Sequence, residues 1–325
     1  KIYNRLGIHF SVNIGESHYQ KELEGVIDML LKEKIAKESE GALVISLDKF
    51  NLPTVMVRKS DGATLYTTRE IANLRYRIEE YKPSKIIYVV GNEQALHFNQ
   101  LFAIAKLLNL GENVELTHVK YGMISESEGK KFSTREGRTI KLEEVLDRAV
   151  ELSTKVLQDR NTNLKKGEMK DVAKAVGIGA VKYNDLSQNR MSDISFDWDK
   201  MLSFEGNSAP YLQYTYARLK SILRKAGRVP KTTIATLENE RDQTLVLKLL
   251  EFPQVLEHTL ESYLPNYLAN YLYELAKEIN SFYHSEPVLY SESGIRNTRL
   301  NLVKASARTL KTGLQLLGIE TVERM

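Results

Sequence analysis

The 325-residue sequence contains no cysteine. This absence excludes disulfide bonds and cysteine-ligated zinc sites, and it agrees with a reducing compartment such as the cytoplasm. No apolar run approaches the roughly 18 residues that a membrane-spanning helix requires, so no membrane association is expected. An excess of charge of one sign is also lacking, because 46 basic residues face 42 acidic ones. The net charge of +4 is too small to identify a nucleic-acid-binding protein, so such a function must depend on local clusters.

What is present suits globular domains. Hydrophobic residues make up 42% of the chain, enough for sizeable cores, and the length predicts about two domains. The opening stretch, Lys1 to Arg5, resembles neither an initiator sequence nor a signal peptide. We therefore expect a segment of a longer protein.

Hydrophobic periodicity predicts an α/β pattern up to about residue 140. Short apolar runs bounded by glycine or proline alternate with helical spacing, which favours a parallel sheet. We expect β structure at 7–14, a helix over 17–36, strands at 42–47 and 54–57, a helix from Tyr66 to about Tyr81, a buried strand at 85–91 and a helix over about 94–109.

The pattern changes near residue 141, after which helical spacing dominates. The turn cluster 206–210 is expected to open a long helix at Tyr211, and an apolar stripe predicts a last helix from about Ser293. The predicted domains are an α/β part over 1–140, a helical connection over 141–205 and an all-helical domain over 206–325.

Four segments of the α/β part contain residues suited to chemistry. The glycine-bounded loop 129–137 combines Lys130, Lys131, Ser133, Thr134 and Arg135, which suit binding of a polyphosphate or, alternatively, a solvated charged hairpin.

Tyr66 and Glu70 lie where a helix is expected to begin, and a carboxylate there can bind a cation. The spacing from Thr67 to Glu70 also fits a capping box, which is the structural alternative. Glu16 lies between an expected strand and helix, where helix capping by Glu16 or Ser17 is again the alternative.

Gly91, Gln94 and His97 follow the expected buried strand. Ligands bind at the carboxyl ends of parallel strands, so His97 is the histidine best placed to contact a nucleotide, although a lone histidine is often structural.

Aromatic and cationic residues are interleaved in the helical part. Stacking combined with phosphate neutralisation is how proteins hold unpaired RNA bases, whereas a solvated helix face is the alternative. The residues concerned are Tyr211, Gln213, Tyr214, Tyr216, Arg218, Lys220, Arg224, Lys225 and Arg228, and then Arg296, Arg299, Lys304, Arg308 and Lys311.

Six segments together resemble the arginyl-tRNA synthetases, which are class I aminoacyl-tRNA synthetases. They occur in the family's order and span essentially the whole chain: GES (15–17), DGATLYTTREIA (61–72), YVVGNEQALHF (88–98), GKKFSTREGRTIKLEEVL (129–146), MLSFEGNSAPYLQYTYARLKSI (201–222) and GLQLLGIETVERM (313–325). The resemblance implies the C-terminal half of a Rossmann-like catalytic domain, followed by the helical anticodon-binding domain called DALR.

The resemblance also implies roles for individual residues. Glu16, Tyr66, Glu70 and Gln94 would hold the arginine side chain, whose planar guanidinium favours carboxylate partners. Gly91 and His97 would contact ATP, while Lys130, Lys131, Ser133, Thr134 and Arg135 would form the family's version of the KMSKS loop. The implied anticodon contacts are Tyr211, Tyr214, Arg218, Tyr290 and Met325.

The implied activity is a cytoplasmic arginine–tRNA ligase. ATP, accompanied by Mg²⁺, would activate arginine as arginyl-adenylate, and tRNA(Arg) would then accept the arginine; no protein-bound metal, DNA or membrane partner is expected.

Three departures from the family pattern affect these expectations. Glu70 stands where aspartate is usual, Phe132 and Thr134 replace the usual Met and second Lys, and Lys130 is therefore the expected substitute lysine. No HIGH-type histidine pair occurs, so the fragment alone is expected to be inactive. The alternatives are a non-catalytic tRNA-binding module and a helical scaffold protein.

Overall fold

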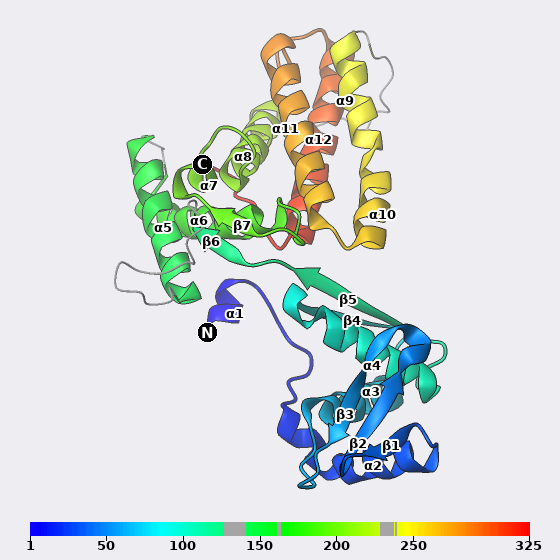
Figure 1. Cartoon of the computed structure of the whole chain (residues 1–325). Coiled ribbons are helices and arrows are strands. Elements are labelled where there is room, and N and C mark those ends of the chain that lie inside the picture. Colours follow the sequence, from blue (N-terminus) through cyan, green and yellow to red (C-terminus); the bar gives the residue numbers. More distant parts are fainter. Residues whose placement is uncertain (127–140, 161–163, 228–236, 238) are drawn as a thin grey trace. The chain divides into compact units, whose positions relative to one another are not determined.

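The computed structural model describes residues 1–126, 141–160, 164–227, 237 and 239–325. The chain divides into two compact units: one comprises Phe10–Gly122, and the other comprises Lys1–His9 with Met123–Met325. Figure 1 shows both units, coloured along the sequence. The domain boundaries expected at residues 140 and 205 stay predictions.

The unit Phe10–Gly122 contains both helices and strands. Its first three strands form an antiparallel sheet in the order β1-β2-β3, and β4 pairs with β5 in parallel. The elements are the 3-10 helix η1 (Glu16–Glu22), α2 (Leu23–Lys32), β1 (Ala36–Ser39), β2 (Ala42–Leu47), η2 (Asp48–Phe50), β3 (Leu52–Arg58), α3 (Tyr66–Tyr81), β4 (Lys85–Gly91), η3 (Asn92–Gln94), α4 (Ala95–Leu107) and β5 (Glu115–Tyr121).

Helix α2 confirms only the middle of the helix predicted over 17–36. Its apolar side chains at positions 23, 26, 27 and 30 follow helical spacing and are fully buried. Burial of each such side chain contributes roughly 1.5–3 kcal/mol. Lys34 adopts φ 56° just after the helix, and the chain then enters β1 at Ala36. The predicted helix is therefore wrong at its C-terminal end.

The hairpin between β1 and β2 is set by its two loop residues. Ser39 pairs with Ala42, which leaves Glu40 and Gly41 as the loop. Both have positive φ angles, 50° and 78°, as the turn of a two-residue hairpin requires.

Strand β4 confirms the predicted strand at 85–91 but corrects its burial. Only Tyr88 is buried, while Ile87 and Val89 on the opposite face are 45% and 65% exposed. Alternate side chains, Ile86 and Val90, pack into the core of this unit. The apolar run predicted a strand covered on both faces, but the described residues of this unit cover one face.

The β structure expected at 7–14 is wrong. These residues form no helix or strand, and Phe10 and Val12 are 61% and 49% exposed. Alternating apolar residues form a strand only when a neighbouring strand accepts their backbone hydrogen bonds. The described residues supply no such neighbour for this segment.

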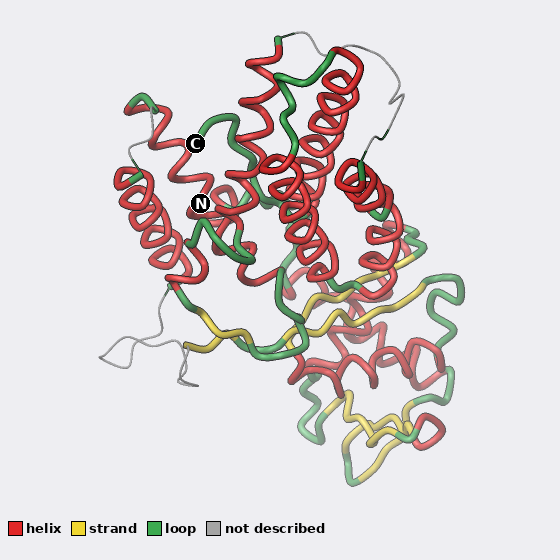
Figure 2. Tube along the Cα trace, turned by 90° about the horizontal axis from the view of Figure 1, so that it is seen from above, coloured by secondary structure: helices red, strands yellow, loops and turns green. Residues whose placement is uncertain are grey.

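The second unit is dominated by helices, as the red tube in Figure 2 shows. The long helices predicted after residue 141 are confirmed, including the last one from Ser293. Its elements are α1 (Ile2–Arg5), β6 (Ile124–Glu126), α5 (Leu142–Asp159), α6 (Lys166–Leu186), β7 (Ile194–Phe196), α7 (Trp198–Leu202), α8 (Ala209–Ala226), α9 (Glu240–Leu250), α10 (Phe252–Ser262), α11 (Pro265–Ser285) and α12 (Ser293–Leu316).

Helix α8 is central to the core of this unit. Ser208 caps its start by accepting a hydrogen bond from the Tyr211 backbone at 3.3 Å, and Pro210 occupies the first turn. One face packs against α11 and α12 through buried leucines such as Leu212 and Leu219. Tyr211, Tyr214 and Arg218 of the same helix are only half-buried.

No helix in the described ranges is long and apolar enough to cross a membrane.

Candidate functional site

One face of α3 collects the polar side chains of the first candidate site. Tyr66, Glu70, Asn73 and Arg77 follow one another at steps of three and four residues, so they share a face of the helix. The start of the helix is fixed by Thr68, whose hydroxyl donates to the Val57 carbonyl of β3 at 2.5 Å. This anchor holds the face in place at the edge of the three-stranded sheet.

Glu70 is the most unusual residue of this face because it is 8% exposed. Burial raises the pKa of its carboxyl, while Arg77 and hydrogen bonds from Tyr66 and Asn73 oppose the shift. A buried carboxylate of this kind is costly unless a cation approaches it. Glu70 is therefore suited to binding a positively charged ligand.

Tyr66 and Glu16 lie within electrostatic range of this carboxylate. Burial, followed by the charge of Glu70, raises the pKa of Tyr66 to about 12, so its phenol remains a hydrogen-bond donor at neutral pH. Glu16 adds a second negative charge that raises both pKa values. Glu16 is mostly exposed, and its carboxylate lies 3.8 Å from Arg69. Such an exposed pair is worth about 0–1 kcal/mol, so Arg69 does not tie up Glu16 firmly.

The ring of His97, on α4, contacts the ring of Tyr66. The two ring centroids are 4.8 Å apart, and the His97 Nε2 atom is buried without a hydrogen-bond partner. Burial, and then His118, lowers the pKa of His97, so the ring is neutral near pH 7. Gly91 ends β4 beside these residues in the chain, and a Cβ there would lie 2.6 Å from the Glu93 carboxylate. Gln94 is exposed in η3, and among the described residues no hydrogen bond joins it to Tyr66 or Glu70.

Two buried atoms at this site lack partners within the described part of the chain. They are the Asn73 Oδ1 atom and the His97 Nε2 atom. Buried polar atoms are normally satisfied, so these two are candidates to meet a ligand. Together with two carboxylates and a phenol, they make a site that favours a cation with several N–H donors.

The capping alternatives for these residues are wrong. Helix α3 begins after Leu65 with no side-chain cap, so Thr67 and Glu70 do not form a capping box. Gly15 precedes η1 without a side-chain cap, so neither Glu16 nor Ser17 caps a helix there. Asn73 and Arg77 were not selected from the sequence. They lie three and seven residues after Glu70, and this helical spacing alone would have placed them on the same face.

The phosphate-loop candidates lie outside the described residues. They are Lys130, Lys131, Ser133, Thr134 and Arg135.

The second candidate site lies on α8. The guanidinium of Arg218 lies over the Tyr214 ring, 4.9 Å from its centroid, and Tyr211 occupies the same helix face two turns earlier. All three side chains are half-buried. Aromatic and cationic groups are therefore held together on one surface, as binding of unpaired RNA bases requires.

Several other residues of α8 that were considered for RNA binding have structural roles instead. Gln213 is fully buried and donates to the carbonyls of Ala175 and Glu320. The Tyr216 hydroxyl donates to the Glu323 carboxylate at 2.9 Å, and Lys220 and Arg224 pair with the same carboxylate. Burial would raise the pKa of Glu323, but the hydrogen bonds from Tyr216 and Lys220 outweigh it and lower that pKa.

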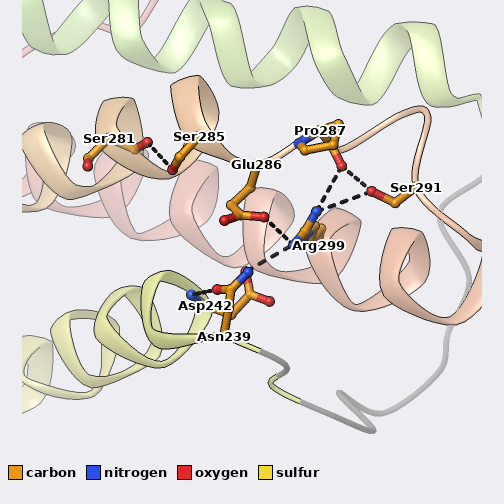
Figure 3. A network of polar contacts seen from close by, with 8 residues as sticks. All are labelled: Asn239, Asp242, Ser281, Ser285, Glu286, Pro287, Ser291 and Arg299. Atoms are coloured by element: carbon orange, nitrogen blue, oxygen red, sulfur yellow. Dashed lines mark hydrogen bonds and ion pairs between the residues drawn. The ribbon is translucent and has the colours of Figure 1, made fainter.

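Arg299 is another exception, because it is 6% exposed rather than solvated, and Figure 3 shows its polar contacts. Its guanidinium lies 3.6 Å from the Asp242 carboxylate and also donates to Glu286. It further donates to the Pro287 carbonyl at 3.1 Å and to the Ser291 hydroxyl at 3.2 Å. Arg299 thus anchors both ends of the segment that connects α11 to α12.

That anchored segment carries Tyr290, which is 93% exposed. Single exposed aromatic rings are common on protein surfaces, but this ring is fully accessible to a ligand. Met325 lies elsewhere in the unit, in a small apolar cluster that also includes Tyr214. The structure therefore brings Met325 and Tyr214 together, and it presents Tyr290 separately on a fixed loop.

Comparisons with known proteins agree in both parts of the chain. Residues 1–198 match the family described as tRNA synthetases class I (R), catalytic domain, and residues 212–325 match the DALR anticodon binding domain. An arginine–tRNA ligase of Chloroflexus aggregans is 42% identical over 99% of this chain, and one of Fusobacterium nucleatum is 44% identical over all of it. The chain spans 57% and 58% of those proteins.

Solved structures give the same result. Thermus thermophilus arginyl-tRNA synthetase aligns with the whole chain at a TM-score of 0.90 and 25% identity, and 62% of that protein is covered. Plasmodium falciparum arginyl-tRNA synthetase aligns at 0.86 and 27% identity, with 56% of that protein covered.

Proposed function

Because the chain belongs to the arginyl-tRNA synthetase family, we propose that it supplies the arginine-binding and anticodon-binding parts of an arginine–tRNA ligase. The proposed division is an α/β catalytic part over 1–140, a helical connection over 141–205 and an anticodon-binding domain over 206–325. A cytoplasmic location is part of the same proposal.

The observation that carries the proposal is the buried Glu70 carboxylate. Tyr66, Glu70 and Asn73 present a phenol, a carboxylate and an amide on one helix face, with a second carboxylate, Glu16, within electrostatic range. A guanidinium ion has five donors in a fixed plane and binds carboxylates more specifically than an ammonium ion does. We propose that Glu16, Tyr66, Glu70 and Gln94 bind the side chain of arginine.

The proposed reaction has two steps. The arginine carboxylate attacks the α-phosphorus of ATP and releases pyrophosphate, and a terminal ribose hydroxyl of tRNA(Arg) then attacks the adenylate carbonyl and releases AMP. Gly91 and His97 are proposed to contact ATP, while Lys130, Lys131, Ser133, Thr134 and Arg135 are proposed to stabilise its phosphates. Mg²⁺ is proposed only as the cation that accompanies ATP.

Binding of arginine tests the first half of this proposal. Calorimetric titration is expected to show binding of L-arginine and much weaker binding of L-citrulline, which has the same shape without the charge. Glu70→Gln should weaken arginine binding by about 1.5–3 kcal/mol, the usual contribution of a hydrogen bond to a charged group. Glu22→Gln, in the exposed part of η1, is the matched control. Equal affinity for arginine and citrulline would contradict the proposed site.

Binding of tRNA tests the second half, for which Tyr211, Tyr214, Arg218, Tyr290 and Met325 are the proposed contacts. Tyr290→Ala is expected to weaken binding of tRNA(Arg) by about 1–3 kcal/mol, as loss of one base-stacking ring does. Because the ring is 93% exposed, the melting temperature should not change. Leu260→Ala, 73% exposed in the same unit, is the control. Unchanged affinity for Tyr290→Ala would remove Tyr290 from the interface, and tRNA binding without arginine binding would favour the non-catalytic module.

A further inference from the structure

Asn280 of α11 lies at the centre of the proposed RNA-binding surface of α8. Its amide oxygen accepts a hydrogen bond from Arg218 Nη1 at 2.7 Å. Its amide nitrogen donates to the Tyr211 hydroxyl at 2.9 Å and to the Thr215 hydroxyl at 3.1 Å. One amide therefore orients a cation and a phenol that are two helical turns apart.

The direction of these hydrogen bonds matters for a ligand. Because the Tyr211 oxygen accepts from Asn280, its own O–H hydrogen remains available as a donor. Thr215 is satisfied differently, since it accepts from Asn280 and donates to the Tyr211 backbone carbonyl at 2.9 Å. Among the described residues no group accepts from the Tyr211 O–H, so it can donate outward.

Arg218 is held between two aromatic rings. Its guanidinium carbon lies 4.9 Å from the Tyr214 centroid and 5.2 Å from the Tyr283 centroid. These two cation–π contacts, together with the hydrogen bond to Asn280, limit the positions of the guanidinium, so part of the entropy cost of ordering it for a ligand is already met in the free protein.

Arg218 differs from the other cations of α8 in the groups that neutralise them. Lys220 and Arg224 share the Glu323 carboxylate, at 3.3 Å and 3.8 Å. Within the described ranges no carboxylate pairs with Arg218. A half-buried cation without an acidic partner, beside an outward O–H donor, favours an anion with several acceptor oxygens.

We propose that Asn280 is a positioning residue for RNA binding: it holds Arg218 and Tyr211 as a pair of donors for one backbone phosphate of the anticodon loop. Tyr283 is the second ring that fixes the guanidinium. This inference rests on the proposed function, and it adds two residues of α11 to a surface that the sequence placed on α8.

Asn280→Asp tests the inference because it preserves the shape of the side chain. The aspartate neutralises Arg218 and accepts the Tyr211 O–H hydrogen, which removes both donors from the ligand. Affinity for tRNA(Arg), measured by fluorescence anisotropy on the 325-residue chain, should fall about tenfold, as expected when a charged hydrogen bond is lost. The slope of log affinity against log salt should also decrease by about 1, because one phosphate contact is lost.

Two further variants separate positioning from other effects. Gln254→Glu adds the same charge on the exposed face of α10 and should leave affinity nearly unchanged. In an Arg218→Ala background, Asn280→Asp should have a clearly smaller effect than in the wild type, because only the Tyr211 O–H donor remains for the aspartate to remove. Tyr211→Phe keeps the ring and should weaken binding several-fold, which tests the donor pair even if Asn280→Asp folds poorly.

The outcomes are distinguishable. Wild-type affinity for Asn280→Asp, the same loss with and without Arg218, or wild-type affinity for Tyr211→Phe would each overturn the inference while the proposed function stands. Failure of the wild-type chain to bind tRNA would refute the anticodon-binding function, and with it this inference.

Discussion

Removal of the Arg299 guanidinium is the most informative perturbation of the helical unit. Arg299 and Asp242 are 6% and 1% exposed, so neither charge can be solvated when its partner is lost. Arg299→Ala would leave Asp242 buried without this cation and would release the Pro287 carbonyl and the Ser291 hydroxyl, which Arg299 now contacts.

The expected cost is large because of this burial. Breaking a buried ion pair by removing one partner costs about 3–5 kcal/mol, whereas an exposed pair contributes about 0–1 kcal/mol. We therefore expect the free energy of unfolding to fall by about 3–5 kcal/mol. The affinity for tRNA(Arg) should fall as well, because the released segment carries Tyr290.

Guanidinium chloride denaturation, followed by far-ultraviolet circular dichroism of the helices, measures this loss. Arg308→Ala is the matched control, because Arg308 lies on the same helix and is exposed. The control should change stability by less than about 0.5 kcal/mol. The double variant Arg299→Met with Asp242→Asn should recover part of the loss, since it removes both buried charges. A loss below about 1 kcal/mol for Arg299→Ala would refute the reasoning.

Two other perturbations follow from the same principles. Burial raises the pKa of Glu70 above its ordinary 4.5, so its carboxylate destabilises the fold progressively as the pH rises from the pKa of the unfolded chain through the pKa of the folded one. Glu70→Gln should therefore be more stable than the wild type by about 0.5–2 kcal/mol at pH 8, and the difference should vanish below about pH 4. Equal stability of the two proteins at both pH values in thermal denaturation would contradict this. At Gly177 a Cβ would lie 2.7 Å from the backbone of Ala149, so Gly177→Ala should lower the free energy of unfolding by about 1–3 kcal/mol in chemical denaturation. Gly167 has open space around it in the same helix, so Gly167→Ala should instead raise the free energy of unfolding by up to about 1 kcal/mol. A change of the same sign for both variants would contradict the close approach of α5 and α6.

Much of the fold could be predicted from local sequence. The helix Tyr66–Tyr81, the strand Lys85–Gly91 and the last helix from Ser293 all follow from hydrophobic periodicity, which depends on residues near in the sequence. The β structure expected at 7–14 failed because a strand depends on a partner strand, and local sequence does not show whether that partner exists.

The candidate sites divide in the same way. The sequence selected Tyr66 and Glu70 from a motif, but it left helix capping open until the structure showed Glu70 buried and bonded to Tyr66 and Asn73. Arg299 was one of several similar basic residues in the sequence, and only its neighbours from other helices identify it as buried.

The sequence by itself determined the family, the order of its parts and most of the helices, because motifs and periodicity are properties of adjacent residues. Only the tertiary structure decided which charges are neutralised. Glu323 satisfies Lys220 and Arg224, whereas Arg218 receives an amide and two aromatic rings instead. Arg218 lies 62 residues from Asn280 and Arg224 lies 99 residues from Glu323 in the sequence, and the effect of these partners depends on distance and burial, which a linear pattern does not contain.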